Sequence, residues 1–451
     1  MTIHMHSGDI TIENITKIEG NASLKVTIEN DSVKDLKFII ADYKRFYTTA
    51  VKGKPIIAVP SFLSRICGTC SVAHLFASVM AIERSQGIEV TEQTKLLRRL
   101  AYDGLMIRDH ALHLYFFVLP DILGLDSILD IPDDDENFGH ILLHDSFDIK
   151  RLGTDITNVI IGAAIHAPLP TVGGFLRNPD STKFPDLIAR LETIRPQVLR
   201  GIKTFLEWNA VLIRNSNYLC LRNDPTLSVN AELRGASKRF DFLEGDVVNS
   251  NGKRIPKSEF KNYLKYVQIP YSQAEGYEFS DTQKDYLVGS LARINLNKDL
   301  LHPRTKADLA DNALSVFPSN NIYHNNLAQA IEILHCVDEA IDILKTIKIA
   351  DEKPVRKPAQ AGAGVGLVEA PRGILYHMAK VNDKGIIEDY DVVVPTAQNQ
   401  INIENDLKDY FNKNLDKSEE TLRLDAEKIV RAYDPCMSCA TNFLKIDWVR
   451  K

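Results

Sequence analysis

The chain has 451 residues, of which 44% are hydrophobic and 25% charged, the ordinary balance of a protein with ample apolar material for a buried core. Its formal net charge is −6, so there is no basic field that would attract nucleic acid or anionic lipid. Residues 1–14 lack the apolar segment of a secretory leader and no run reaches the roughly 18 apolar residues of a membrane span, which predicts a cytoplasmic protein without a membrane segment.

The first forty residues predict a β-meander. Three segments alternate polar residues with apolar or β-branched ones, which is the pattern of half-buried strands. Asn30-Asp31 offers turn chemistry between the last two segments. The expected strands are residues 9–13, 22–28 and 33–40.

Helical periodicity begins directly after Cys70 and continues to Gly87. A second helix is expected from an N-cap at Thr91 to Pro120, which lacks the N–H that a continuing helix needs. Further helices are expected at about 181–215, 323–347 and 420–432, and hairpins at 247–252 and between 373–379 and 386–394.

These elements predict an α+β fold, a mostly helical bundle core with peripheral antiparallel β-hairpins and a β-meander. No repeat or low-complexity linker interrupts the chain. We therefore expect residues 1–451 to form a single domain, with the meander of residues 1–60 packed on the helical core.

Four of the six cysteines form two Cys-x-x-Cys pairs at opposite ends of the chain, Cys67 with Cys70 and Cys436 with Cys439. Local zinc sites usually place their second pair about 15–20 residues after the first, whereas nearly the whole chain separates these pairs. Thiolates select soft or borderline metals, and nickel, iron and zinc each accept four of them. The pattern predicts one buried metal site that the complete fold assembles.

The other two cysteines, Cys220 and Cys336, lie among apolar residues and are expected to be buried thiols. Six cysteines in a chain of this length do not make a disulfide framework, which favours a reducing compartment. Several histidines on apolar segments are expected to be hydrogen-bonded core residues rather than metal ligands. They are His74, His110, His113, His335 and His377.

Six motifs together resemble the large subunit of nickel-iron hydrogenases, from about Ile12 to Asn442 and in the order of that family. The motifs are Lys17-Ile-Glu-Gly20, Arg65-Ile-Cys-Gly-Thr-Cys70, Asp109-His-Ala-Leu-His113, Glu369-Ala-Pro-Arg-Gly373, Val394-Pro-Thr-Ala-Gln-Asn399 and Asp434-Pro-Cys-Met-Ser-Cys439. The residues of these motifs look closest to those of the cytoplasmic branch of the family, whose members are linked to nicotinamide or cofactor 420.

The resemblance implies a nickel-iron centre whose iron carries one carbon monoxide and two cyanides. It implies that Cys67 and Cys436 bind nickel as terminal ligands, while Cys70 and Cys439 bridge nickel to iron. It also implies reversible heterolytic cleavage of dihydrogen, with the protons and electrons leaving by separate routes.

The resemblance further assigns roles around that centre. Arg372 would lie over the open position between the metals, held by the carboxylates of Asp109 and Asp434. Pro371 shapes a loop whose neighbouring amides can donate to one cyanide, and Thr396 offers a hydroxyl to the other.

Glu19 would take the proton after a cysteine sulfur such as that of Cys436. His166 matches a family histidine close to the ligands. A cubane cluster takes four cysteines, and only Cys220 and Cys336 remain. The electrons therefore need a partner, a small subunit that carries iron-sulfur clusters, together with a possible diaphorase module.

The chain departs from the family pattern at Asn21, Tyr47 and Asn442, where the family usually has His, Glu and His. The last two normally help to hold an outer magnesium ion, for which Tyr and Asn are poor ligands, so we expect that ion to be absent or replaced by an ordered hydrogen-bond network involving Asn21 and Asn442. Residues 443–451 follow the usual cleavage point. Either the subunit assembles without cleavage, or this is a form that never received its metals.

Two other functions fit parts of the pattern. A dihydrogen-sensing regulatory subunit would keep the same centre and signal through a partner. A hydrogenase-like scaffold without catalysis would hold zinc or no metal at the four cysteines, although the retention of all four argues against it.

Overall fold

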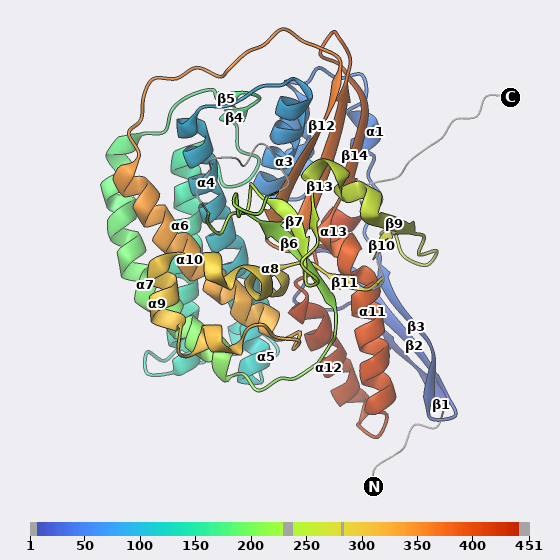
Figure 1. The fold of residues 1–451 in the computed structure, drawn as a ribbon. Coiled ribbons are helices and arrows are strands. Elements are labelled where there is room, and N and C mark those ends of the chain that lie inside the picture. The colour runs from blue at the N-terminus through green and yellow to red at the C-terminus, as the bar shows by residue number, and fades with distance from the viewer. Residues whose placement is uncertain (1–6, 229–237, 281–283, 442–451) are drawn as a thin grey trace, which may run out of the picture.

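The computed structural model describes residues 7–228, 238–280 and 284–441. Four long helices form one side of the molecule, where α4 packs against α6 and α10, and α7 against α6 and α10 (Figure 1). Their bounds are α4 Glu92–Ala111, α6 Phe138–Ile161, α7 Phe184–Glu207 and α10 His324–Thr346. Among the described residues, no helix has both the length and the apolar character that a bilayer crossing requires.

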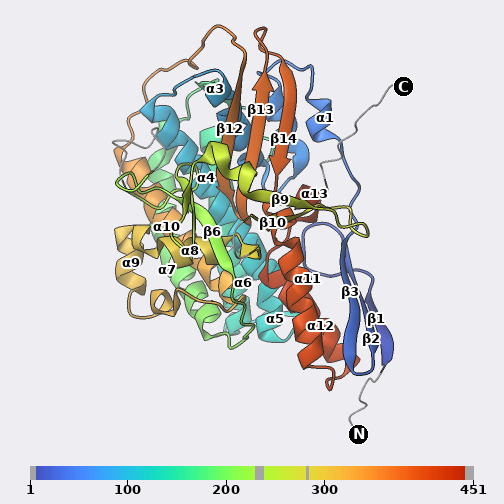
Figure 2. The ribbon, with the colours of Figure 1, turned by 45° about the vertical axis from the view of Figure 1, so that its right-hand side comes forward.

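A three-stranded antiparallel sheet forms the other side of the core, with the order β12-β13-β14 (Figure 2). Its strands are Gly362–Ala370, Gly373–Val381 and Ile387–Val393, and helix α3, Ser71–Ser85, packs on β12 and β13. A Cβ added at Gly366 would stand 1.8 Å from the backbone oxygen of Ala77 on α3. Glycine therefore permits the close approach that brings the start of α3 to the sheet.

The predicted meander is present as β1 Ser7–Ile12, β2 Ala22–Glu29 and β3 Ser32–Ile40, with Asn30 and Asp31 in the left-handed turn. It packs on α11, Pro395–Lys413, because the N–H groups of Val33 and Phe38 donate to side chains of that helix. Figure 2 shows the meander beside α11 and α12, Glu419–Ala432, away from the four-helix side. The extent of the domain stays a prediction.

Smaller elements complete the fold. They are α1 Tyr47–Ala50, α2 Val59–Leu63, α5 Leu119–Leu123, α8 Ser290–Asn297, α9 Pro303–Leu309, α13 Met437–Ala440, β4 Pro170–Thr171, β5 Gly174–Phe175, β6 Asn217–Arg222, β7 Asp246–Asn249, β8 Arg254–Ile255, β9 Leu264–Val267, β10 Gly276–Phe279 and β11 Tyr286–Leu287. The α+β class is confirmed, and so are the two predicted hairpins, which are β7-β8 and β13-β14.

Two predicted helix ends are wrong. The helix expected to stop at Pro120 continues, because a π-helical segment, Leu112–Val118, follows α4 and Pro120 lies in the first turn of α5, where no N–H is needed. The helix expected over 181–215 ends at Glu207, because the chain beyond it pairs with another segment through Ile213 and Asn321. Helices α6 and α11 were not predicted.

Candidate metal centre

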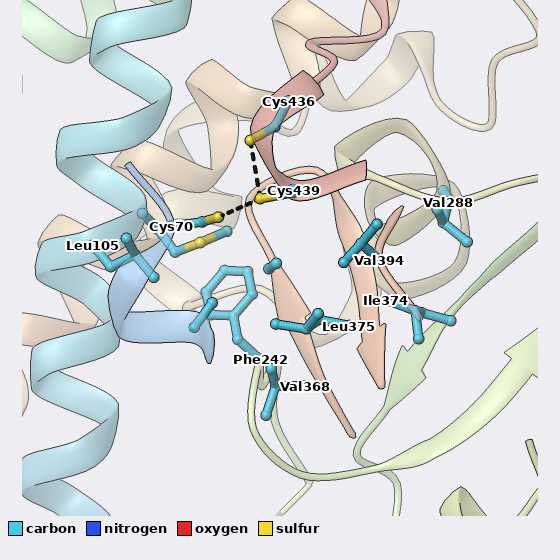
Figure 3. Packing of buried hydrophobic residues seen from close by; sticks show 14 of the residues in the cluster. Cys70, Leu105, Phe242, Val288, Val368, Ile374, Leu375, Val394, Cys436 and Cys439 are labelled. Atoms are coloured by element: carbon cyan, nitrogen blue, oxygen red, sulfur yellow. Dashed lines mark hydrogen bonds between the residues drawn. The ribbon is translucent and has the colours of Figure 1, made fainter. Parts of the chain in front are cut away.

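The structure brings the four predicted cysteines together, and their ligand atoms all lie within 4.8 Å of one another. The Sγ atoms of Cys67 and Cys436 are 3.4 Å apart. The Sγ atom of Cys439 lies 3.0 Å from those of both Cys70 and Cys436, and Figure 3 draws these two contacts as dashed lines. Two thiolates at right angles around a metal with bonds of about 2.3 Å would be ~3.3 Å apart. All four side chains are buried, so the donor set fits a soft or borderline metal ion.

Four segments remote in sequence position these sulfurs. Cys70 immediately precedes α3, and Cys436 immediately precedes α13. The N–H of Met437 donates to the backbone oxygen of Glu19 at 3.0 Å, and the N–H of Cys436 donates to Oγ1 of Thr396 at 2.9 Å. The second cysteine pair is therefore tied both to the loop after β1 and to the start of α11.

Gly20 is required at this junction. Its φ is +84°, and an added Cβ would stand 2.4 Å from the Asp42 carboxylate and 2.7 Å from Cβ of Met437. A side chain at position 20 would therefore push the loop after β1 away from the second cysteine pair.

The four sulfurs share little negative charge. Hydrogen bonds with Cys436, and then with Cys439 and Cys70, lower the pKa of Cys67 well below its ordinary value. Burial raises the pKa of the Cys436 and Cys439 thiols, and the pKa of Cys70 is raised to about 11. A divalent metal ion can bind all four thiolates only if the other three thiols lose their protons.

Arg372 lies beside the sulfurs at the turn between β12 and β13, with 4% of its surface exposed. Its guanidinium contacts Asp109 of α4 at 2.8 Å and Asp434 at 3.0 Å. Burial alone would lower the pKa of Arg372, but Asp109 and Asp434 outweigh it and raise the pKa well above its ordinary value. A permanent cation, paired on both sides, therefore faces the cysteine cluster.

A small cavity opens between the cysteines and the sheet. The predicted residues Pro371, Arg372 and Thr396 all line it. Because the Thr396 oxygen already accepts from the Cys436 N–H, the hydrogen of its hydroxyl remains available to a group in the cavity. Sequence reasoning missed four lining residues, which are His74, Ala370, Leu375 and Pro395.

His74 is buried as predicted, but it also borders the metal ligands. Its Nε2 lies 3.6 Å from the Cys439 sulfur, and its Nδ1 lies 3.0 Å from Nε2 of His377, whose Nδ1 bonds to the Tyr390 hydroxyl at 2.9 Å. Burial lowers the pKa of His74 to about 4, so the imidazole is neutral. The signal that could have found it is its position four residues after Cys70, one turn along α3.

The other predicted core histidines have partners away from the sulfurs. His110 bonds to Glu332, and His113 bonds to Gln329 and to the Arg431 backbone oxygen. His166, with φ of 53°, bonds through Nδ1 to the Ser64 backbone oxygen, just before the first cysteine motif.

Glu19 reaches the cluster from the loop after β1. Its Oε2 lies 3.0 Å from the Cys436 sulfur and accepts the Ser438 N–H at 3.1 Å, while its Oε1 accepts the Ser438 hydroxyl at 2.6 Å. Ser438 Oγ is also 3.3 Å from a carboxylate oxygen of Asp42, which is partly exposed. Burial, and then the charge of Cys67, raise the pKa of Glu19 above its ordinary value.

The predicted loss of the outer ion site concerns Tyr47 and Asn442. The Tyr47 hydroxyl donates to the Arg65 backbone oxygen at 2.8 Å. Asn442 and residues 443–451 lie outside the described residues, so the structure does not test the expectations for position 442 and for the tail. Within the described ranges, the four cysteines are the one group of three or more His, Cys, Asp or Glu residues close enough to share a metal ion.

Comparison with known proteins identifies the family to which the chain is similar. A family model for nickel-dependent hydrogenases matches residues 45–138 and 313–442, which include both cysteine motifs. The alpha subunit of sulfhydrogenase 2 from Pyrococcus furiosus is 31% identical over 97% of this chain and 100% of its own length. Subunit beta of the NAD-reducing hydrogenase HoxS from Cupriavidus necator is 27% identical over 97% of this chain and 95% of its own length.

Solved structures have the same fold. An NAD+-reducing NiFe-hydrogenase in its H2-reduced state is similar, with a TM-score of 0.80 and 23% identity over 96% of this chain and 99% of that chain. A NiFeSe-hydrogenase from Dm. baculatum has a TM-score of 0.76 and 20% identity over 97% of this chain and 100% of that chain.

Proposed function

This chain belongs to the family of nickel-dependent hydrogenases, and we propose that it is the catalytic large subunit of a nickel-iron hydrogenase that converts dihydrogen reversibly into protons and electrons. One observation carries the proposal. Four buried sulfurs from the two ends of the chain meet beside a buried arginine, Arg372, that two carboxylates hold.

The cysteines would hold the metals, with Cys67 and Cys436 on nickel alone and Cys70 and Cys439 shared with iron. When bound, the nickel-iron pair with one carbon monoxide and two cyanides would supply the Lewis-acid and redox chemistry of dihydrogen cleavage. The cavity beside the cysteines supports the assignment of the cyanides, because the Thr396 hydroxyl presents a hydrogen-bond donor to it.

Arg372 would polarise dihydrogen at the edge of the cavity. Its charge is permanent, and the low dielectric of a buried site strengthens its field. Asp109 and Asp434 fix the guanidinium, since each accepts from a different Nη atom. Their two negative charges also offset the penalty of burying the cation.

The proton would leave from the Cys436 sulfur to Glu19 and then through the Ser438 hydroxyl to Asp42. Each step is supported by a distance between heavy atoms of 3.3 Å or less. Asp42 is partly exposed, so it would return the proton to water. Protein groups alone would make this route.

The electrons would leave through a partner subunit that carries iron-sulfur clusters. All six cysteines are free thiols, and Cys220 and Cys336 are both buried and too few for a cluster of four ligands. Gly68, between the two cysteines of the first pair, is exposed, and an added Cβ there would meet nothing within 4 Å. Ile165 is also exposed, next to His166, which bonds to the Ser64 backbone oxygen just before the first cysteine motif. We place the docking face of the small subunit there.

The relatives support two finer points. Because one similar protein is named an NAD-reducing hydrogenase, a diaphorase module that passes electrons to a nicotinamide is the acceptor we propose to test first. All six cysteines are free thiols, and thiols stay reduced in a reducing compartment. We therefore assign the subunit to the cytoplasm.

We also propose that hydrogen bonds replace an outer magnesium ion. Arg45 donates to the Ile66 backbone oxygen at 3.0 Å and its guanidinium carbon lies 5.6 Å from the Tyr47 ring centroid, while Tyr47 bonds to Arg65. The backbone N–H of Arg45 donates to the Thr441 oxygen at 3.2 Å. Protein groups thus join the segment before α1 to both cysteine motifs.

The test is metal analysis and turnover of the chain purified with its partner subunit after expression with nickel-hydrogenase maturation proteins. X-ray fluorescence should find about one nickel per large subunit and iron in excess of nickel, because the clusters of the partner also contain iron, and the complex should reduce methyl viologen under dihydrogen. Nickel without turnover would favour the dihydrogen sensor, and zinc in place of nickel, or neither of the two metals, would favour the scaffold. A Cys439→Ser variant, which removes one proposed bridging ligand, should lose both nickel and turnover.

A further inference from the structure

A second buried arginine, Arg293 of α8, lies beneath the turn that carries Arg372, and 1% of its surface is exposed. Its Nε and Nη2 donate to the two carboxylate oxygens of Glu332 on α10 at 2.6 and 2.7 Å. Its Nη1 donates to the Glu369 carboxylate of β12 at 2.9 Å. The face of the guanidinium lies over Phe242, with 5.6 Å between its central carbon and the ring centroid.

The same guanidinium holds the backbone immediately before Arg372. Nη1 donates to the Ala370 backbone oxygen at 3.1 Å, and Nη2 donates to the Pro371 backbone oxygen at 2.9 Å. Pro371 has no backbone N–H, so it cannot donate a hydrogen bond between the strands that would fix this turn. Two consecutive peptide groups next to Arg372 are therefore oriented by one side chain from below.

The carboxylate that precedes this turn is fixed as well. The second oxygen of Glu369 accepts the Leu221 N–H at 2.6 Å, and the Glu369 backbone oxygen accepts the Tyr102 hydroxyl at 2.9 Å. Glu369 thus joins β12 to β6 and to α4. A shift of the end of β12 would therefore break at least one of these buried hydrogen bonds.

Helices α4 and α10 connect Arg293 to the partners of Arg372. Glu332 also accepts from His110, which directly follows Asp109 on α4. One turn before Glu332 on α10, Gln329 donates to the Asp434 carboxylate at 2.8 Å. Helix α10, which holds Arg293 through Glu332, therefore also contacts α4 next to Asp109 and bonds to Asp434, the two carboxylates that hold Arg372.

Stability alone does not account for this arrangement. Taking an arginine and two carboxylates out of water is expensive, and replacing such a group by well-packed apolar residues is often neutral or stabilising. The planar fork of arginine gives what apolar residues cannot, a set of donors with fixed relative directions. All of its N–H directions are occupied by named acceptors, which lie on α10 and on β12 with the turn that follows it.

We propose that Arg293 is a positioning residue for the hydrogenase reaction, which sets the orientation of Arg372 by holding the Ala370 and Pro371 carbonyls and by locking α10 to β12 through Glu332 and Glu369. The inference rests on the proposed function. A change at position 293 should therefore lower turnover at an intact metal centre, rather than prevent the centre from forming.

The experiment compares Arg293→Lys with Arg195→Lys in the complete complex. Arg195 of α7 is a matched control, because it is also buried and donates to both oxygens of one carboxylate, that of Asp338, but it has no contact with the turn at 370–372. Lysine keeps the charge at each position and removes the fork. We measure nickel and iron per chain, kcat per bound nickel, and KM for dihydrogen.

Arg293→Lys should keep its nickel and iron and lose on the order of 10- to 100-fold in kcat per nickel, the scale that a misplacement of about 1 Å produces. Arg195→Lys should match the wild type in both quantities. The infrared bands of the carbon monoxide and cyanides should also shift in Arg293→Lys alone, because Pro371 and its neighbouring amides line their cavity. If Arg293 served the stability of the fold alone, Arg293→Lys would yield less folded protein. The protein that did fold would then keep the wild-type infrared bands and the wild-type kcat per nickel.

The inference is overturned if Arg293→Lys has the wild-type kcat per nickel, or if Arg195→Lys loses as much. If Arg293→Lys cannot be purified with metal, Glu332→Gln serves instead, since it leaves Arg293 in place and removes the charge that anchors it to α10. Glu332→Gln should then lose kcat per nickel, and wild-type kcat in that variant would equally reject the inference. A failure of the proposed function is distinct, because the wild type itself would lack turnover.

Discussion

Replacing Glu19 by glutamine tests the proposed proton route directly. Glutamine has the size of glutamate, so its side-chain oxygen can still accept the Ser438 N–H that now bonds at 3.1 Å. The backbone oxygen of residue 19, which accepts the Met437 N–H, is untouched. The fold around Cys436 should survive, while the group 3.0 Å from its sulfur can no longer take up a proton.

Loss of a positioned general base typically removes a factor of about 10²–10⁴ in rate. At about 1.36 kcal/mol per factor of ten, the barrier should rise by about 2.7–5.4 kcal/mol. A Glu19→Asp variant should also be impaired, because one fewer methylene withdraws the carboxylate by about 1.5 Å. The distance to the sulfur would then be ~4.5 Å, beyond a hydrogen bond.

The assay is viologen reduction under dihydrogen, divided by the nickel content of each preparation. Glu404→Gln is the matched control, because Glu404 is similarly half-buried and also accepts one backbone N–H, from Phe38, and one hydroxyl, from Tyr271. Full nickel with turnover within threefold of the wild type in Glu19→Gln would refute the route through Glu19. An equal loss in Glu404→Gln would assign the effect to the fold.

Three further outcomes follow from packing and charge. Gly366→Ala should lower the free energy of unfolding in urea by about 3 kcal/mol or more, because its Cβ would stand 1.8 Å from the Ala77 oxygen, whereas Gly68→Ala, with nothing within 4 Å, should change it by less than about 0.5 kcal/mol. Burial raises the pKa of Asp103 well above 3.8, so folding takes up a proton there and the free energy of unfolding falls as pH rises above 3.8, by up to about 1.4 kcal/mol per pH unit; Asp103→Asn should flatten this fall in a series of urea unfolding curves that starts at about pH 4, and an unchanged slope would contradict this. Zinc uptake by the metal-free chain should release about three protons, because the pKa values of all the site thiols except Cys67 are raised, and release of fewer than one proton in a calorimetric buffer series would reject it.

The sequence was most informative where residue types are chemically rare. The two cysteine pairs predicted a single site because no local fold brings residues 369 positions apart together, and their Sγ atoms do meet. The motif around Arg372 predicted its pairing with Asp109 and Asp434, and the distances agree with that pairing. Such residues report function at low sequence identity because few other side chains can do the same chemistry.

Helix α11 was missed for a physical reason. Its first half contains Gln398, Asn399 and Asn402, polar residues that would usually face water, and the two asparagines also have modest helix propensity. In the fold they are buried, and their amides replace backbone pairing: Asn399 bonds to both backbone groups of Val288, and Gln398 donates to the Ile374 oxygen. Tertiary hydrogen bonds stabilise this helix, and periodicity cannot reveal them.

Residues that act through shape or through other residues were also beyond the sequence. Leu375 lines the metal cavity because β13 presents alternate side chains to it, which follows only once the register with β12 is known. Arg293 stands in an unremarkable segment, Ser290–Asn297, and nothing local connects it to residue 372. Its partners lie 39 and 76 positions away in the chain.

The remoteness of the two cysteine pairs determines how the centre is held. In a zinc finger the ligands gather only when metal binds, so the binding free energy is also the folding free energy. Here protein contacts already close the site: Cys436 to Thr396, Met437 to Glu19, and Asp434 to Arg372. Asp434 even holds a φ of 49°, a conformation that its ion pair must stabilise. A site closed by arginine and carboxylates keeps four sulfurs in place without relying on the metal, and it leaves the charged groups that grip Arg372 next to the position where dihydrogen must be polarised.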